Sequence, residues 1–143
     1  IRYYFFKGLE IMIVIVDYGL GNIRSVAGAL KKLGFEYCVS SIPEDIEKAD
    51  KLILPGVGAY GDGMKNLREK RLIDVLNRVV LEEKKSILGI CLGSQLMTNE
   101  GFEHGHHQGL KWIDAIVVRM DPKDKSIRVP HVGWNNLKQA KED

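Results

Sequence analysis

The chain has 143 residues, enough for one domain with a substantial core, and its apolar and charged fractions are those of an ordinary globular protein. Its 21 basic and 19 acidic residues nearly balance, which excludes a strong field for binding nucleic acid or an anionic membrane surface. No apolar run reaches transmembrane length, and two cysteines, Cys38 and Cys91, are too few for a disulfide framework, which favours a reducing cytoplasm.

Both ends of the sequence are unusual. Residues 1–11 are rich in aromatic side chains, show no clear periodicity and lack the apolar core and cleavage site of a signal peptide. A complete strand pattern begins only at Met12. We therefore expect residues 1–11 to be a leader or a fragment artefact, and residues 12–143 to be a partial domain that is truncated at its C-terminus.

Strand and helix patterns alternate along the first two thirds of the chain. Apolar runs of strand length occupy residues 12–17, 35–40, 51–54 and 86–90, and helical spacing occupies residues 23–33, 41–49 and 64–83. Asn22 is expected to cap the first helix and Gly34 to end it. Ser41 and Glu44 have the spacing of a capping box for the second helix, and a break is expected near Lys70 in the third.

This alternation predicts an α/β fold, a doubly wound and mostly parallel sheet of flavodoxin-like type with helices on both faces. Ligands of such folds lie at the carboxyl ends of the strands, where Asp17, residues 55–58 and Cys91 all fall. Beyond Asn99 the pattern changes to a His-rich loop followed by extended segments at residues 113–118 and 127–135. Antiparallel additions to the sheet are one arrangement for these segments.

The apolar run at residues 86–90 predicts a buried strand of a parallel sheet, and Cys91 lies between this strand and a helical pattern that begins at Leu92. Gly89 and Gly93, two residues to either side, lack the Cβ atoms that would crowd so tight a corner. The arrangement predicts a nucleophile elbow with cysteine in place of serine. The helix start would favour the thiolate, and the N–H of Leu92 would hold an oxyanion. A buried structural cysteine is the alternative, and the spacing by itself does not decide between them.

Residues 56–61 match the pattern GxGxxG, which is typical of a dinucleotide-binding loop. That fingerprint belongs to the first strand of its unit and needs an acidic residue at the end of the next strand, about twenty residues on. Asp74 falls at that distance but inside a helical pattern, so we reject the dinucleotide interpretation. We interpret the glycine-rich loop of residues 55–63 as a cradle whose N–H groups face a pocket above Cys91.

Three histidines, His104, His106 and His107, follow Glu103. Their spacing is not that of a zinc site and no cysteine lies near them in the sequence, so we expect a solvated loop and no metal.

Several other residues have two interpretations. Asp17 is expected to bond backbone groups of the adjacent turn, although a catalytic carboxylate is the alternative. His131 is either a base for Cys91 or part of a structural corner, and Trp112 and Trp134 are expected in packing or in an interface.

Taken together, four stretches resemble the class I (triad) glutamine amidotransferases. They are residues 15–26 (IVDYGLGNIRSV), 54–62 (LPGVGAYGD), 89–95 (GICLGSQ) and 129–135 (VPHVGWN). Within that family the chain is most similar to the glutaminase subunits of imidazole glycerol phosphate synthases, which serve histidine biosynthesis. The resemblance runs from Met12 to about residue 137. The four stretches are highly specific together, although each alone is only moderately so.

The resemblance implies that Cys91 attacks the carboxamide of L-glutamine, giving a glutamyl thioester and ammonia without a cofactor. It implies substrate-binding roles for Val57, Gly58, Leu92, Gln95 and Glu100. It also implies a face that docks on a (βα)8-barrel synthase partner, through which the ammonia travels. Residues matching that face are Asn22, Arg24, His131, Trp134 and Asn135. No nucleic-acid or membrane partner is implied.

The chain also departs from the family pattern. The family's base is a histidine with a glutamate two residues on, and no His-x-Glu occurs here, so we expect an incomplete triad and an essentially inactive 143-residue chain. Ser94 replaces a residue that is usually apolar, and residues 98–101 keep only the second of a usual pair of acids. Residues 109–115 look like a paralogous branch that supplies ammonia for surface-polysaccharide sugars. That branch, a non-catalytic binding module and a cysteine hydrolase or peptidase are the alternatives.

Overall fold

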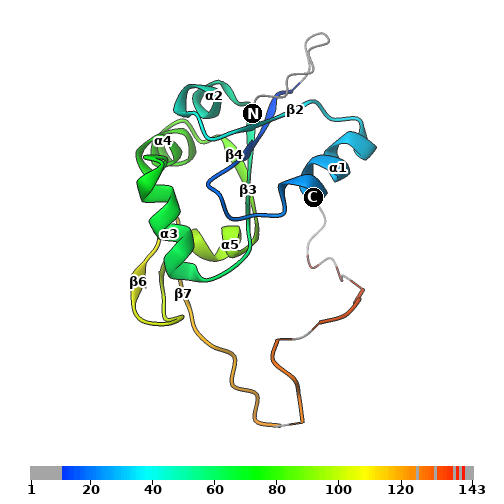
Figure 1. The fold of residues 1–143 in the computed structure, drawn as a ribbon, viewed down its shortest axis with the longest axis vertical. Coiled ribbons are helices and arrows are strands. Elements are labelled where there is room, and N and C mark those ends of the chain that lie inside the picture. The colour runs from blue at the N-terminus through cyan, green and yellow to red at the C-terminus, as the bar shows by residue number, and fades with distance from the viewer. Residues whose placement is uncertain (1–10, 125, 131, 137, 139, 141–143) are drawn as a thin grey trace.

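A parallel sheet of four strands forms the centre of the protein in the computed structural model, which describes residues 11–124, 126–130, 132–136, 138 and 140 (Figure 1). The strand order is β2-β1-β3-β4, and each neighbouring pair is parallel. The strands are β1 (Ile13–Val16), β2 (Tyr37–Ser40), β3 (Lys51–Gly56) and β4 (Ser86–Cys91). Every predicted strand of the sheet is therefore present, and the order confirms a doubly wound arrangement.

Helices cover both faces of this sheet (Figure 1). The helix α1 (Ile23–Leu33) packs through Leu30 against Ile13, Ile15 and Ile53 on one face. On the opposite face, β1 and β3 contribute Val14, Val16, Leu52 and Leu54 to the larger core. The remaining helices cover this core. These are α2 (Pro43–Lys48), α3 (Tyr60–Glu69), α4 (Ile73–Asn77), a π-helical turn at Arg78–Glu82, and α5 (Leu92–Leu96). Alternate residues of the buried strands thus serve the two cores.

The predicted ends of α1 are confirmed, but the capping of α2 differs from the prediction. The Asn22 side chain accepts a hydrogen bond from the Ser25 N–H at 3.2 Å, and Gly34 ends the helix at φ 78°. The capping box at Ser41 is wrong, because α2 begins after Ile42 with no side-chain cap. The Ser40 hydroxyl accepts the Ile42 N–H instead and donates to Asp45.

The glycine-rich loop is shorter than predicted. The helix α3 begins at Tyr60, so residues 60–63 are helical and only residues 57–59 link β3 to α3. The break near Lys70 is confirmed, because α3 ends at Glu69 and α4 begins at Ile73. Asp74 lies within α4, as the rejection of a dinucleotide site required.

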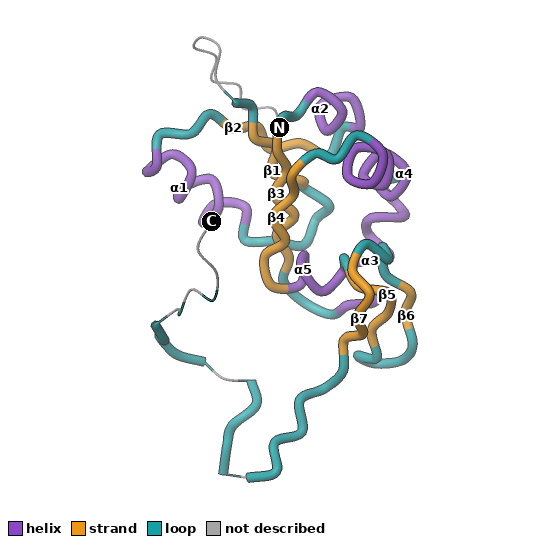
Figure 2. The backbone as a smooth tube through the Cα atoms, turned by 180° about the vertical axis from the view of Figure 1, so that it is seen from behind, coloured by secondary structure: helices purple, strands orange, loops and turns teal. Residues whose placement is uncertain are grey.

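The residues after α5 form a separate three-stranded sheet of order β6-β5-β7 (Figure 2). Its strands are β5 (Thr98–Gly101), β6 (His107–Gln108) and β7 (Ile113–Val117). The antiparallel arrangement considered for residues 113–118 is wrong, because β7 pairs with β5 in parallel. The antiparallel partner of β5 is β6, which comes from the His-rich loop. The described residues between 127 and 135 contain no strand.

The elbow strand β4 is less buried than a central strand of a parallel sheet. It lies at the edge of the four-stranded sheet in the part of the chain that the structure describes. Leu88 is 57% exposed and Ile90 is 37% exposed, so the prediction of a buried strand is wrong for this edge. Among the described residues, no helix combines the length and apolar character required to cross a membrane.

Candidate active site

Cys91 is the last residue of β4 and lies at the corner where the chain turns into α5. Its backbone has φ 53° and ψ −118°, a conformation that non-glycine residues adopt only under strain. Its side chain is exposed, whereas that of the second cysteine, Cys38, is buried. The predicted elbow geometry is confirmed, and the alternative of a buried structural cysteine is excluded for Cys91. Strain at an exposed nucleophilic side chain is typical of a functional site.

Glycines on either side of Cys91 permit the corner, as the sequence predicted. A Cβ on Gly93 would collide with the carbonyl oxygen of Leu54, because α5 packs directly on the backbone of β3. A Cβ on Gly89 would lie 2.6 Å from the Cα of Ser94. The Ser94 hydroxyl donates to the Cys91 carbonyl oxygen at 2.7 Å, which gives a local reason for a polar residue where the family is usually apolar. Since α5 has only five residues, its electrostatic effect comes from the N–H groups of a single turn.

The end of β3 brings the glycine-rich loop to the elbow. Gly56 is the register partner of Cys91, and a Cβ on Gly56 would lie 2.6 Å from the Gly93 nitrogen. Gly58 has φ 101°, which only glycine adopts without strain, and the Val57 side chain is 50% exposed. The sulfur is therefore not remote from this loop. The backbone of Gly56, where β3 ends, lies beside Cys91, where β4 ends.

The other predicted substrate-binding residues lie on α5 and β5. Leu92 is buried and Gln95 is exposed on α5. The Glu100 carboxylate lies 2.6 Å from His106 Nε2, and the His106 ring stacks on Phe102 with centroids 5.2 Å apart. The structure thus places Glu100 in a pair with His106 within the His-rich segment.

Glu103 is a helix-capping residue that the sequence analysis did not identify. Its carboxylate accepts a hydrogen bond from the Tyr60 N–H at 3.0 Å. Tyr60 is the first residue of α3 and follows Ala59, the last residue of the glycine-rich loop, so Glu103 caps the helix from a distant segment. The contact joins residues 43 positions apart, and no local pattern in the sequence predicts it.

We expect Glu103→Ala to lower the free energy of unfolding by about 1 kcal/mol, because the Tyr60 N–H loses its acceptor. Glu103→Gln retains an oxygen acceptor and should lose about half as much or less. Urea unfolding measures both. Glu69→Ala is the matched control: that carboxylate lies 3.9 Å from the Lys65 ammonium at the surface, a pair worth about 0.5 kcal/mol or less. Equal stability of Glu103→Ala and the parent would contradict the capping role.

The turn after β1 is fixed from two sides. The Asp17 carboxylate accepts the Gly19 N–H at 3.0 Å, which confirms its predicted role as a backbone partner. From α3, Lys70 Nζ donates to the Asp17 carbonyl oxygen at 2.9 Å, and Asn66 Nδ2 donates to the Tyr18 carbonyl oxygen at 3.1 Å. The Tyr18 side chain that follows is fully buried.

The residues expected at a partner face lie in two parts of the chain that differ in secondary structure. Asn22 and Arg24 are exposed where the β1–α1 turn leads into α1. Trp134 is completely exposed and Asn135 is exposed, both in a segment without helix or strand, and His131 lies outside the described residues. Trp112, in contrast, packs against the larger core and donates to Asn77 at 2.7 Å, as predicted for a packing residue.

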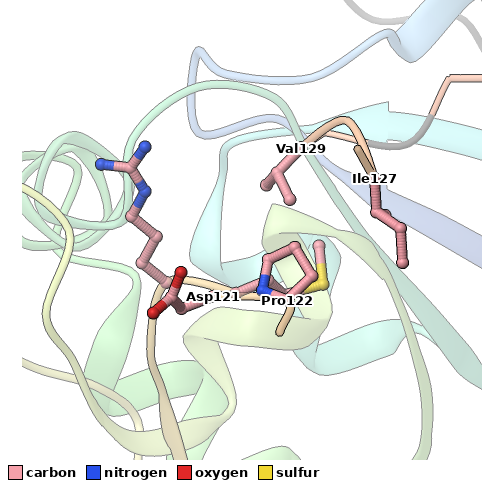
Figure 3. A pocket seen from close by; sticks show the side chains of 6 residues that line it. Asp121, Pro122, Ile127 and Val129 are labelled. Carbon is pink, nitrogen blue, oxygen red and sulfur yellow. The ribbon is translucent and has the colours of Figure 1, made fainter. Parts of the chain in front are cut away.

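A separate hollow lies in the segment after β7. Asp121, Pro122, Ile127 and Val129 line it together with Arg119 and Met120, around a volume of about 510 Å³ (Figure 3). It contains none of the residues of the elbow or of the glycine-rich loop. We therefore assign the chemistry to the elbow and not to this hollow.

Comparisons with known proteins agree with this geometry. The family described as glutamine amidotransferase class-I matches residues 14–141. The chain is 46% identical over 132 residues to imidazole glycerol phosphate synthase subunit HisH 1 of Campylobacter jejuni, covering 92% of this chain and 65% of that relative. Subunit HisH 2 of Methanococcus maripaludis is 48% identical over 127 residues, covering 89% of this chain and 62% of that relative.

A solved structure described as a crystal structure of glutamine amidotransferase shares the fold. It has a TM-score of 0.61 and 29% sequence identity, and the match covers 72% of this chain and 54% of that chain. The chain spans less than two thirds of the length of the two curated relatives.

Proposed function

Because the chain belongs to the class-I glutamine amidotransferase family, we propose that it is a glutaminase subunit that releases ammonia from L-glutamine in the cytoplasm for a synthase partner. The observation that carries the proposal is the exposed Cys91 at φ 53°, on a strand–helix corner beside the glycine-rich loop. An inert cysteine would give no reason to maintain that strain. The same strained corner argues against a non-catalytic binding module.

In the proposed reaction, the Cys91 thiolate attacks the carboxamide carbon of glutamine and forms a tetrahedral oxyanion. Backbone N–H groups at Val57, Gly58 and Leu92 stabilise that oxyanion. The C–N bond then breaks, the nitrogen takes up a proton and leaves as ammonia, and a glutamyl thioester remains. Water hydrolyses the thioester to glutamate and restores Cys91. No cofactor takes part.

Gln95 and Glu100 are proposed to hold the substrate. Gln95 is exposed on α5, one turn after the nucleophile. In the proposed complex Glu100 binds glutamine while His106, at 2.6 Å, holds its carboxylate in place. Those two assignments come from the family resemblance. They are compatible with the exposed position of Gln95 and the partly exposed position of Glu100.

We propose that the partner is a (βα)8-barrel cyclase and that the product pathway is histidine biosynthesis. The two relatives described above are named as subunits of imidazole glycerol phosphate synthase. The proposed docking face comprises Asn22, Arg24, His131, Trp134 and Asn135. A fully exposed tryptophan such as Trp134 supports it, because buried aromatic side chains often anchor protein interfaces.

Titration of the cyclase partner against glutaminase rate tests this proposal. In the complete gene product that carries this chain, glutamate release from glutamine should rise as the cyclase is added and level off at equimolar partner. A rate that does not respond would favour an independent cysteine hydrolase. Ammonia transfer to a surface-sugar acceptor, without transfer to the cyclase, would favour the paralogous branch that residues 109–115 resemble.

A further inference from the structure

The hydroxyl of Tyr18 is an unpaired polar group in the interior. The side chain is 1% exposed, and among the described residues its oxygen has no hydrogen-bond partner. Burying a hydroxyl without a partner costs free energy that phenylalanine at the same position would avoid. Packing alone therefore gives no reason for tyrosine here.

This hydroxyl lies at the base of the elbow. A Cβ on Gly56 would collide with it, and the same Cβ would lie 2.6 Å from the Gly93 nitrogen and 2.7 Å from the Leu92 Cβ. Gly56 is in turn the register partner of Cys91. The Tyr18 oxygen thus lies where the end of β3 meets the start of α5, next to the residue that pairs with Cys91.

Two contacts keep the tyrosine in this position. The Asn66 side chain donates a hydrogen bond to the Tyr18 carbonyl oxygen, and the Lys70 side chain donates one to the Asp17 carbonyl oxygen. These two bonds fix the backbone that carries the Tyr18 ring. The ring itself belongs to the larger core. A side chain fixed in this way cannot turn its hydroxyl out to solvent.

Burial raises the pKa of the Tyr18 phenol above its ordinary value, and the negative charge of the Cys91 thiolate raises it further. The phenol therefore stays protonated at any pH at which the enzyme works, and remains a donor.

Few other ionisable groups face the elbow. The end of β3 with its loop, residues 54–58, carries none, and α5 carries none. The β1–α1 turn brings Asp17, which is bonded to Gly19, and Lys70 reaches that turn from α3. The segment after α5 brings Glu100, paired with His106, and Glu103, bonded to Tyr60.

We propose that Tyr18 is a positioning residue whose hydroxyl donates a hydrogen bond to the Cys91 sulfur when the sulfur is a thiolate. A thiol sulfur is a weak hydrogen-bond acceptor and a thiolate is a much stronger one, so the hydrogen bond from Tyr18 forms when Cys91 loses its proton. The Tyr18 hydroxyl would then favour the reactive form of the nucleophile from inside the protein. The inference rests on the proposed function of Cys91.

Alkylation of Cys91 by iodoacetamide tests the proposal without glutamine or a partner. The thiolate displaces iodide, so the rate between pH 5 and pH 10 follows the thiolate fraction. Mass spectrometry of the Cys91 peptide separates this reaction from any at the buried Cys38. We expect Tyr18→Phe to slow alkylation at pH 7 by about three- to tenfold, and to raise the pH of half-maximal rate by about 0.5 to 1.

Tyr60→Phe is the matched control, because it removes another buried hydroxyl, one that lies 3.3 Å from Thr98 Oγ1. Its alkylation profile should overlie that of the parent. Thermal unfolding should show Tyr18→Phe at least as stable as the parent, since an unpaired hydroxyl is removed.

An unchanged alkylation profile in Tyr18→Phe would overturn the proposal, and so would equal shifts in the two variants or a Tyr18→Phe chain that does not fold. Failure of the glutaminase assay with a normal Tyr18 effect on alkylation would instead count against the proposed function alone.

Discussion

Cys91→Ala is expected to lower glutamate release by at least about 10³-fold, because no other exposed thiol can form the thioester. The rate is measured with glutamine and the cyclase partner in the complete gene product. Cys38→Ala is the matched control: this buried cysteine lies on β2, so its replacement should leave the rate within about twofold once the folded fraction is accounted for. Full activity of Cys91→Ala would exclude the nucleophile assignment.

A glycine at the same position separates chemistry from stability. Cys91→Gly should be equally inactive, yet more stable than Cys91→Ala by about 1 kcal/mol, because glycine adopts φ 53° without strain. Urea unfolding of the two variants measures the difference. If Cys91→Gly were no more stable than Cys91→Ala, the elbow would not be strained in solution.

Gly93→Ala is expected to destabilise the protein by about 4 kcal/mol or more, a large part of the ~5–15 kcal/mol that stabilises a typical domain. The added Cβ would fall on the Leu54 carbonyl oxygen and lie 3.1 Å from the carbonyl carbon of Pro55. All three atoms nearest to the added Cβ belong to the backbone of β3, so no flexible side chain can move aside. The free energy of unfolding, from urea or thermal denaturation, gives the size of the effect.

Gly28→Ala controls for the change from glycine to alanine. Gly28 lies within α1 with nothing within 4 Å of an added Cβ, so alanine should stabilise the helix by about 0.5–1 kcal/mol. Opposite signs for the two variants would show that close packing of α5 on β3 decides the result. A Gly93→Ala variant as stable as the parent would mean that α5 packs elsewhere.

The caps of α1, the parallel sheet and the corner at Cys91 could be predicted from the sequence, because they depend on local sequence signals. The caps at Asn22 and Gly34 depend on residues a few positions away, and both were predicted correctly. The alternation of strands and helices required the parallel sheet. The corner at Cys91 followed from the glycines two residues to either side, since a tight turn demands that Cβ atoms be absent there.

Contacts between distant segments could not be predicted from the sequence. The pairing of β7 with β5 is parallel, because strand partners are chosen by the packing of whole elements. Hydrophobic periodicity could not reveal that β4 is an edge strand within the described part of the chain, with Leu88 exposed. Periodicity reports which residues share a face, but it does not report what covers that face.

The sequence by itself determined that Cys91 lies on a strand–helix corner, because Gly89 and Gly93 on either side permit so tight a turn. Only the tertiary structure brought Glu103 to the first turn of α3 and the Tyr18 hydroxyl beneath Gly56 and Gly93. Those contacts join residues far apart in the sequence, and they form because the core that buries Tyr18 and Tyr60 fixes where each polar atom comes to lie.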